Sequence, residues 1–208
     1  MQLFLTSSVN FVAGDIAKRI ETKGKKLVFI YTAAEVEKGG LNADWCQEDR
    51  QALVEIGFEV TDYTISNKQK LDLENDLRDF EVIFVSGGNT FYLLQQARKS
   101  GFVEVVKDLV NQGKIYIGSS AGSCIAGPNI YPTRSLDNPS KAPELHEYTG
   151  FNLVNFLVLP HWGSLIFKDE YTQSTELIYA EDQIPMVILT DKQYVWVRGQ
   201  KFEIVEVK

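Results

Sequence analysis

The chain has 208 residues, of which 44% are hydrophobic and 24% charged, a composition ordinary for a globular protein long enough to bury a sizeable core. The net charge of -7 argues against a nucleic-acid partner, and no apolar run reaches the length of a membrane span. The N-terminus lacks the basic start of a signal peptide, and two cysteines with two histidines favour neither a disulfide framework nor a zinc site. We therefore expect a single domain over residues 1–208, a cytoplasmic location, and no metal or other cofactor.

Buried-strand patterns alternate with helical patterns over the first two thirds of the chain. The expected strands are LFLTSS at the N-terminus, LVFIYTAA, FEVTDYTI, VIFVSGG and KIYIGSS. The expected helices are FVAGDIAKRIET, NADWCQEDRQALVEIG, KLDLENDLRDF, TFYLLQQARKSG and VEVVKDLVNQG. Strands that alternate with helices of about ten residues predict βαβ units, and hence a parallel sheet with helices on both faces.

The last third of the chain has a different pattern. NFLVLPHWG predicts a short strand that runs into a Pro-His pair, and a helix is expected from about residue 165 to 179. PMVILTDKQYVWVRGQKFEIVEVK then alternates between apolar and polar residues, with turn signals at Thr190-Asp191 and at Gly199. We expect an antiparallel meander at the edge of the sheet. Its exposed edge strand offers a surface through which two copies can pair as a homodimer.

The stretch YIGSSAGSC, at residues 116–124, follows a buried strand and is rich in small residues. Residues 118–122 match G-x-S-x-G, the nucleophile elbow, in its expected strand–turn–helix context. Ser120 would lie at the tip, with its hydroxyl exposed at a helix N-terminus that favours developing negative charge. The alternative is a tight turn whose serines only cap the helix.

A serine nucleophile needs a general base, and the chain has two histidines to supply it. We favour His161, which ends an apolar strand at the edge where parallel sheets form ligand sites, over His146 in a polar loop. The alternative for His161 is a structural histidine packed beside Trp162.

An acid should orient the imidazole and stabilise its charged form. Between Ser120 and His161 the acidic residues are Asp137, Glu144 and Glu147. We take Asp137 as the first choice and Glu144 as the alternative, and either is also explained as a solvated loop carboxylate.

The oxyanion of an acyl-transfer reaction needs two preorganised N–H donors. Ala121, next after the nucleophile, would supply one, and Gly88 at the end of VIFVSGG would supply the other because glycine lets the backbone approach a ligand closely. The alternative is a capping turn with Asn89 or Thr90 as the cap.

Three segments in this order and spacing, VSGGNTFYLL, YIGSSAGSCIAGPNI and VLPHW, resemble the family of peptidase E (aspartyl dipeptidase) and cyanophycinase. The resemblance covers most of the chain. It implies a flavodoxin-like three-layer αβα sandwich related to class I glutamine amidotransferases, and a serine peptidase mechanism without metal. Ser120 matches the nucleophile of the family, His161 the base, and Gly88 and Ala121 the oxyanion donors.

The sequence departs from the family pattern at two places. Counted without gaps, the family's triad aspartate falls on Ser135, two residues before Asp137, and relatives that use a glutamate keep Glu144 open. The family binds an N-terminal aspartate through arginine in the helix after the histidine, whereas the corresponding segment here has Lys168 as its only base. We name Asn89, Thr90 and Lys168 as substrate-binding candidates, and strict aspartyl specificity is not expected.

The sequence thus predicts a serine peptidase, of exopeptidase type, that acts on short peptides through an acyl-enzyme. The alternatives are a hydrolase of another ester or amide bond, and a non-catalytic homologue that binds a small ligand.

Overall fold

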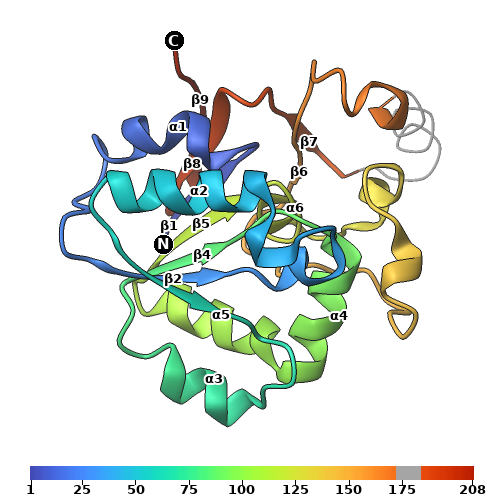
Figure 1. The fold of residues 1–208 in the computed structure, drawn as a ribbon, viewed down its shortest axis with the longest axis horizontal. Helices are drawn as coiled ribbons and strands as arrows, with labels where there is room; N and C mark the ends of the chain where they lie inside the picture. The colour runs from blue at the N-terminus through green and yellow to red at the C-terminus, as the bar shows by residue number, and fades with distance from the viewer. Residues whose placement is uncertain (172–183) are drawn as a thin grey trace.

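The computed structural model describes residues 1–171 and 184–208, and its centre is a seven-stranded sheet in the order β3-β2-β4-β5-β1-β8-β9 (Figure 1). The first five in this order run parallel: β3 (Glu59–Tyr63), β2 (Lys26–Ile30), β4 (Val82–Val85), β5 (Ile115–Ser119) and β1 (Gln2–Thr6). The last two, β8 (Gln193–Arg198) and β9 (Lys201–Glu206), pair antiparallel at the edge. A mainly parallel sheet with antiparallel C-terminal edge strands confirms the predicted fold class.

Helices cover both faces of the sheet, which gives three layers (Figure 1). α1 (Val9–Ile16) and α2 (Asp44–Glu55) lie on one face, and α3 (Lys70–Asp76), α4 (Thr90–Ser100) and α5 (Phe102–Asn111) lie on the other. Two hydrophobic clusters, one on each side, share the alternating side chains of the central strands. β4 is buried at all four positions, because a strand between two helical layers has no solvent-facing side.

The strand order explains how the N-terminal segment reaches the centre of the protein. The order β3-β2-β4-β5 repeats the 2-1-3-4 arrangement of flavodoxin-like sheets, and β1 takes the place of the fifth strand. In this register Thr6 of β1 lies beside Ser119 of β5, and Val85 of β4 lies beside Gly118. The carboxyl ends of β1, β4 and β5 therefore meet at one edge, where α/β proteins form their ligand sites.

One prediction for the last third needs correction, and another lies partly outside the described residues. β7 (Met186–Ile188) does not join the antiparallel meander. It pairs parallel with β6 (Leu157–Leu159) in a separate two-stranded sheet. Of the helix predicted over 165–179, the described part is helical at 168–171, and residues 172–179 lie outside the described residues.

Short 3₁₀ helices complete the connections between these elements. They are η1 (Thr32–Val36), η2 (Gly40–Asn42), η3 (Tyr131–Ser135) and η4 (Pro139–Lys141), and a four-residue helix, α6 (Ala121–Cys124), follows β5. Among the described residues, no helix is both long enough and apolar enough to cross a membrane.

The contact between α6 and β4 leaves no room for a side chain at Gly122. A Cβ added there would lie 2.0 Å from the carbonyl oxygen of Val85. We predict that Gly122→Ala lowers the free energy of unfolding by about 2 to 4 kcal/mol, since overpacking a rigid site forces the backbone apart. Chemical denaturation measures the change.

Gly14 provides the matched control, because it lies in α1 with nothing within 4 Å of an added Cβ. Gly14→Ala should raise the stability by up to about 1 kcal/mol through helix propensity. Equal stability of the Gly122→Ala variant and the wild type would show that α6 does not approach β4 this closely.

Candidate active site

Ser120 stands at the tip of the turn between β5 and α6, in an unusual backbone conformation. Its φ of 50° and ψ of -110° lie outside the regions that a serine ordinarily adopts. Its N–H donates to the carbonyl of Thr6 at 3.1 Å, and its own carbonyl accepts from Ser123 and Cys124 in the first turn of α6. These bonds hold Ser120 at the carboxyl edge of the sheet, directly before α6.

The small residues around Ser120 make this turn possible. A Cβ added at Gly118 would lie 2.5 Å from the carbonyl oxygen of Gly122, so neither the strand nor the helix has space for a side chain there. The two neighbouring serines have structural contacts. Ser123 Oγ donates to the carbonyl of Thr6 at 2.7 Å, and Ser119 Oγ donates to Asp49 at 2.8 Å.

His161 faces Ser120 from the segment that follows β6. Its Nε2 lies 2.9 Å from Ser120 Oγ, and its ring stacks on Phe167 with the centroids 4.7 Å apart. The backbone φ of His161 is 67°, and its N–H donates to Ser7 Oγ at 2.7 Å. Pro160 precedes His161, and the backbone bond to Ser7 fixes the ring where it reaches the serine.

The carboxylate beside His161 is that of Asp191, in the turn between β7 and β8. Asp191 Oδ1 lies 2.7 Å from His161 Nδ1 and accepts a hydrogen bond from Ser7 Oγ, also at 2.7 Å. The hydrogen bond from His161 lowers the pKa of Asp191, burial opposes this shift, and the bond from Ser7 adds to it. Asp191 is therefore ionised at neutral pH and accepts both bonds.

The prediction that Asp137 orients the imidazole is corrected by this arrangement. Asp137 Oδ2 instead accepts from the N–H of Thr90 at 3.0 Å and from the Thr90 hydroxyl. The sequence predicts an acid between Ser120 and His161, whereas in the structure the carboxylate that contacts His161 follows it in the chain, in the order Ser, His, Asp. A turn signal at Thr190-Asp191 was visible in the sequence, but nothing local linked it to His161.

The alternative acid and the second histidine both lie away from the site. Glu144 is exposed and pairs with Lys99 at 2.6 Å. His146 is also exposed, in the same loop. Neither residue lines the cavity that contains Ser120.

Gly88 and Ala121 present backbone N–H groups near Ser120. Gly88 has a φ of 125°, and a Cβ there would lie 2.2 Å from the carbonyl oxygen of Ala33, so only glycine fits. Among the described residues, its N–H has no acceptor within the protein. Ala121 is the first residue of α6, where N–H groups have no acceptor within the helix.

The three substrate-binding candidates differ in position. Asn89 reaches the cavity wall but caps α4, accepting from Tyr92 N–H at 2.9 Å, and it donates to the carbonyl of Asn138 at 3.1 Å. Thr90 is buried against Asp137. Lys168 is exposed and is not part of the cavity lining.

A cavity of about 610 Å³ opens over Ser120 and His161. Its ionisable lining residues include Glu37, Lys38, Asp49, Asp137, Lys141 and His161. Its large apolar lining residues are Trp45, Leu136, Pro160, Ile166 and Phe167. Burial raises the pKa of both Asp49 and Asp137 to about 6, against hydrogen bonds that lower it.

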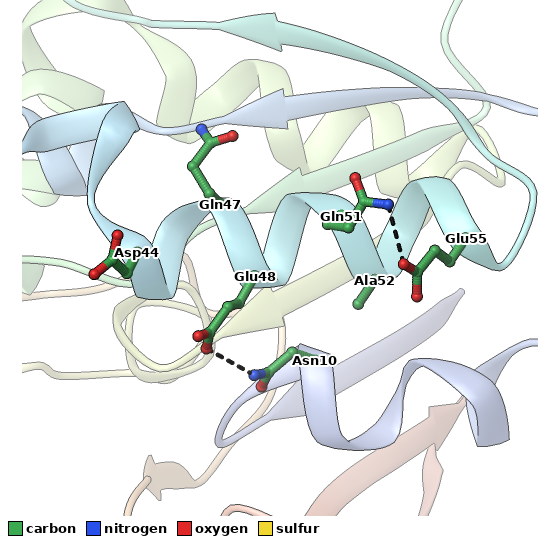
Figure 2. Close-up of a pocket in the computed structure, with 7 residues that line it drawn as sticks. All are labelled: Asn10, Asp44, Gln47, Glu48, Gln51, Ala52 and Glu55. Carbon is green, nitrogen blue, oxygen red and sulfur yellow. Dashed lines mark hydrogen bonds between the residues drawn. The ribbon is translucent and has the colours of Figure 1, made fainter.

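A second hollow of about 590 Å³ runs along α2 on the outside of the protein (Figure 2). It is lined by acidic and amide side chains, among them Asp44, Glu48 and Glu55, with Asn10 of α1 beside Glu48. It contains no pairing of nucleophile and base. The described residues also hold no group of three or more His, Cys, Asp or Glu side chains that could bind a metal ion.

Comparison with known proteins identifies the family of the chain. The profile of Peptidase family S51 matches residues 3–205. The uncharacterized peptidase Lin0382 of Listeria innocua is 34% identical over 183 residues, covering 84% of this chain and 86% of the relative. Peptidase E of Shewanella denitrificans is 26% identical over 208 residues, covering 97% and 81%. A crystal structure from Listeria monocytogenes EGD-e, assigned to peptidase E, superposes with a TM-score of 0.90 at 29% identity, covering 100% of this chain and 98% of that one.

The raised pKa of Asp137 predicts how stability depends on pH. An unfolded aspartate titrates near 4, so between about pH 4 and pH 6 the folded protein keeps a proton that the unfolded chain has lost. This contribution to the free energy of unfolding is present below about pH 4 and is lost as the pH rises through 6. Asp137→Asn should therefore lose less stability than the wild type between those two pH values, measured by urea denaturation. If the free energy of unfolding changes equally in the two proteins between about pH 4 and pH 6, the pKa of Asp137 is not raised in the folded state.

Proposed function

The chain belongs to peptidase family S51, and we propose that this peptidase acts through Ser120 as nucleophile, His161 as general base and Asp191 as the acid that orients the imidazole. One observation carries the proposal, namely the unbroken hydrogen-bond chain from Ser120 Oγ to His161 Nε2 at 2.9 Å and from His161 Nδ1 to Asp191 at 2.7 Å. Nucleophile, base and orienting carboxylate thus stand in hydrogen-bond contact, the arrangement that activates a serine hydroxyl.

The acylation step follows from this geometry. Ser120 Oγ attacks the scissile carbonyl while His161 Nε2 takes its proton. Asp191 accepts from Nδ1 and stabilises the imidazolium that forms. The imidazolium then gives its proton to the leaving amine as the C–N bond breaks. Water, activated by the same imidazole, attacks the ester and releases Ser120.

Gly88 and Ala121 are proposed to hold the oxyanion. Two N–H donors that are fixed before the reaction stabilise the tetrahedral intermediate without reorganisation. Gly88 is fixed by its close approach to Ala33, and Ala121 by the first turn of α6. Both segments adjoin Ser120, because a Cβ at Gly87 would lie 3.3 Å from Ser120 Cβ.

The substrate class is proposed to be short peptides. A cavity of about 610 Å³ holds a few residues, and Trp45, Ile166 and Phe167 give part of its wall an apolar surface. Among the described residues that line it, Lys38 and Lys141 carry ammonium groups and none is an arginine. A substrate carboxylate therefore has no guanidinium to bind it in two-point fashion, and we propose a specificity broader than N-terminal aspartate.

Asp137 is proposed to bind the free amino group of the substrate, which would make the enzyme an exopeptidase. Its Oδ2 is held by Thr90, whereas its Oδ1 has no hydrogen-bond partner among the described residues. Asp137 lines the same cavity as Ser120, and with a pKa of about 6 it is ionised at neutral pH. A fixed, partly buried carboxylate with one oxygen unengaged suits an ammonium group.

The triad assignment predicts the kinetics of four variants on a panel of aminoacyl p-nitroanilides and X-Leu dipeptides. Ser120→Ala and His161→Ala should lower kcat by about 10⁴- to 10⁶-fold, and Asp191→Asn by about 10³- to 10⁴-fold. Glu144→Gln is the control and should leave kcat unchanged. Hydrolysis by Ser120→Ala at the wild-type rate would exclude the serine mechanism. Hydrolysis of the matching p-nitrophenyl esters without hydrolysis of any member of this panel would indicate a hydrolase of another acyl bond.

The role of Asp137 predicts how the enzyme distinguishes free from blocked substrates. Asp137→Asn should reduce the ratio of kcat/KM for an aminoacyl p-nitroanilide to that for its N-acetyl derivative by about 10- to 100-fold, the worth of a hydrogen bond to a charged group. Glu37→Gln, which removes another carboxylate from the cavity wall, should leave the ratio unchanged. An equal loss in both variants would indicate general electrostatics, with no specific ammonium site.

A further inference from the structure

Asp49 is a buried carboxylate beside the triad that the proposed mechanism does not use. It lies on α2, its residue is 4% exposed, and it reaches the wall of the cavity that contains Ser120 and His161. Burying a carboxylate is costly unless hydrogen bonds compensate, so its partners indicate what it does.

Hydrogen bonds to its two oxygens connect α2 to the end of β5 and to the start of α1. Oδ2 accepts from Ser119 Oγ at 2.8 Å, and Oδ1 accepts from the N–H of Asn10 at 3.2 Å. Ser119 Oγ in turn accepts from the N–H of Val9 at 3.2 Å. Ser8, the residue in the N-cap position of α1, makes no capping bond of its own, so Asp49 and Ser119 satisfy the first N–H groups of α1 from outside.

Both ends of this connection adjoin the triad. Ser119 immediately precedes Ser120. At the other end, Ser7 lies two residues before α1, accepts the N–H of His161 and donates to Asp191. Asp49 thus connects the segment that carries the nucleophile to the segment that holds the base and its acid.

The charge of Asp49 also acts on the imidazole. Among the described residues, Asp191, Asp49 and Asp137 carry charges that interact with His161. On α2, Glu48 acts on Asp49 and contacts Asn10 (Figure 2), whereas Arg50 pairs with Asp62. A second negative charge near His161 favours the imidazolium that forms when Ser120 gives up its proton.

We propose that Asp49 is a positioning residue that aligns Ser120 with His161 and stabilises the protonated imidazole, an inference that rests on the proposed function. It acts through Ser119 and the start of α1, and it does not touch the reacting atoms.

Asp49→Asn tests the proposal, because the change keeps the shape of the side chain and removes its charge. With a p-nitroanilide substrate, kcat should fall about 10- to 100-fold while KM changes less than about threefold. The acid limb of the kcat/KM profile should move to lower pH by about 0.5 to 1 pH unit, since protonating the imidazole loses a favourable charge.

Asp15→Asn is the matched control. Asp15 also lies on the sheet-facing side of this layer, bonded to Tyr194 and Arg19, and its loss should change neither kinetic quantity.

NMR provides a readout that needs no substrate. The chain has two histidines, and the ring resonance of His161 should titrate at lower pH in Asp49→Asn than in the wild type while that of exposed His146 stays in place. A titration that does not move, together with an unchanged kcat, would overturn the inference even if the proposed peptidase activity holds. An inactive wild type whose His161 titration moves as expected would instead reject the proposed function alone.

Ser119→Ala is the second variant, for the case in which Asp49→Asn does not fold. It cuts the connection between Asp49 and the elbow and leaves the carboxylate in place. We expect kcat to fall about 10-fold with KM unchanged, and a wild-type kcat in this variant would overturn the positioning role.

Discussion

The proposed active site depends on a single backbone turn, the one that holds Ser120 at a φ of 50° between β5 and α6. Such a conformation costs about 1 to 3 kcal/mol and persists only where the surroundings enforce it. Here the enforcement comes from close backbone contacts: α6 lies against β4 at Gly122, and the N–H of Ser120 is bound to Thr6 of β1. Larger side chains at Gly118 or Gly122 would separate these segments and release the serine.

β1 contributes to both halves of the proposed site, although it contains no residue of the proposed triad. Thr6, at its end, accepts from Ser120 N–H and from Ser123 Oγ, and Ser7 contacts both His161 and Asp191. β1 can do this because it lies between β5, with which it pairs parallel, and β8, the antiparallel strand that follows Asp191. The antiparallel edge of the sheet therefore helps to assemble the site, because the pairing of β8 with β1 brings Asp191 to Ser7 and His161.

The parts of the site that were predictable are those whose cause is local. G-x-S-x-G after a buried strand predicts Ser120, and a glycine that ends the preceding buried strand predicts Gly88. The scarcity of histidine left two candidates for the base, and the strand end favoured His161. Asp191 had no comparable signal, because its role follows from the pairing of β7 with β6 and of β8 with β1, which brings the turn between them to His161. Asp49 is likewise placed by the packing of α2 on α1, which no sequence motif indicates.

The central claim is that Ser120 becomes acylated during turnover, and trapping tests it most directly. The protein would be mixed with an aminoacyl p-nitrophenyl ester that has a free amino group, quenched in acid within one turnover, digested and analysed by mass spectrometry. We expect an added aminoacyl mass on the peptide that contains Ser120 in the wild type, and none in Ser120→Ala. Release of p-nitrophenol with no acyl group on this peptide, or an acyl group on another residue, would contradict it.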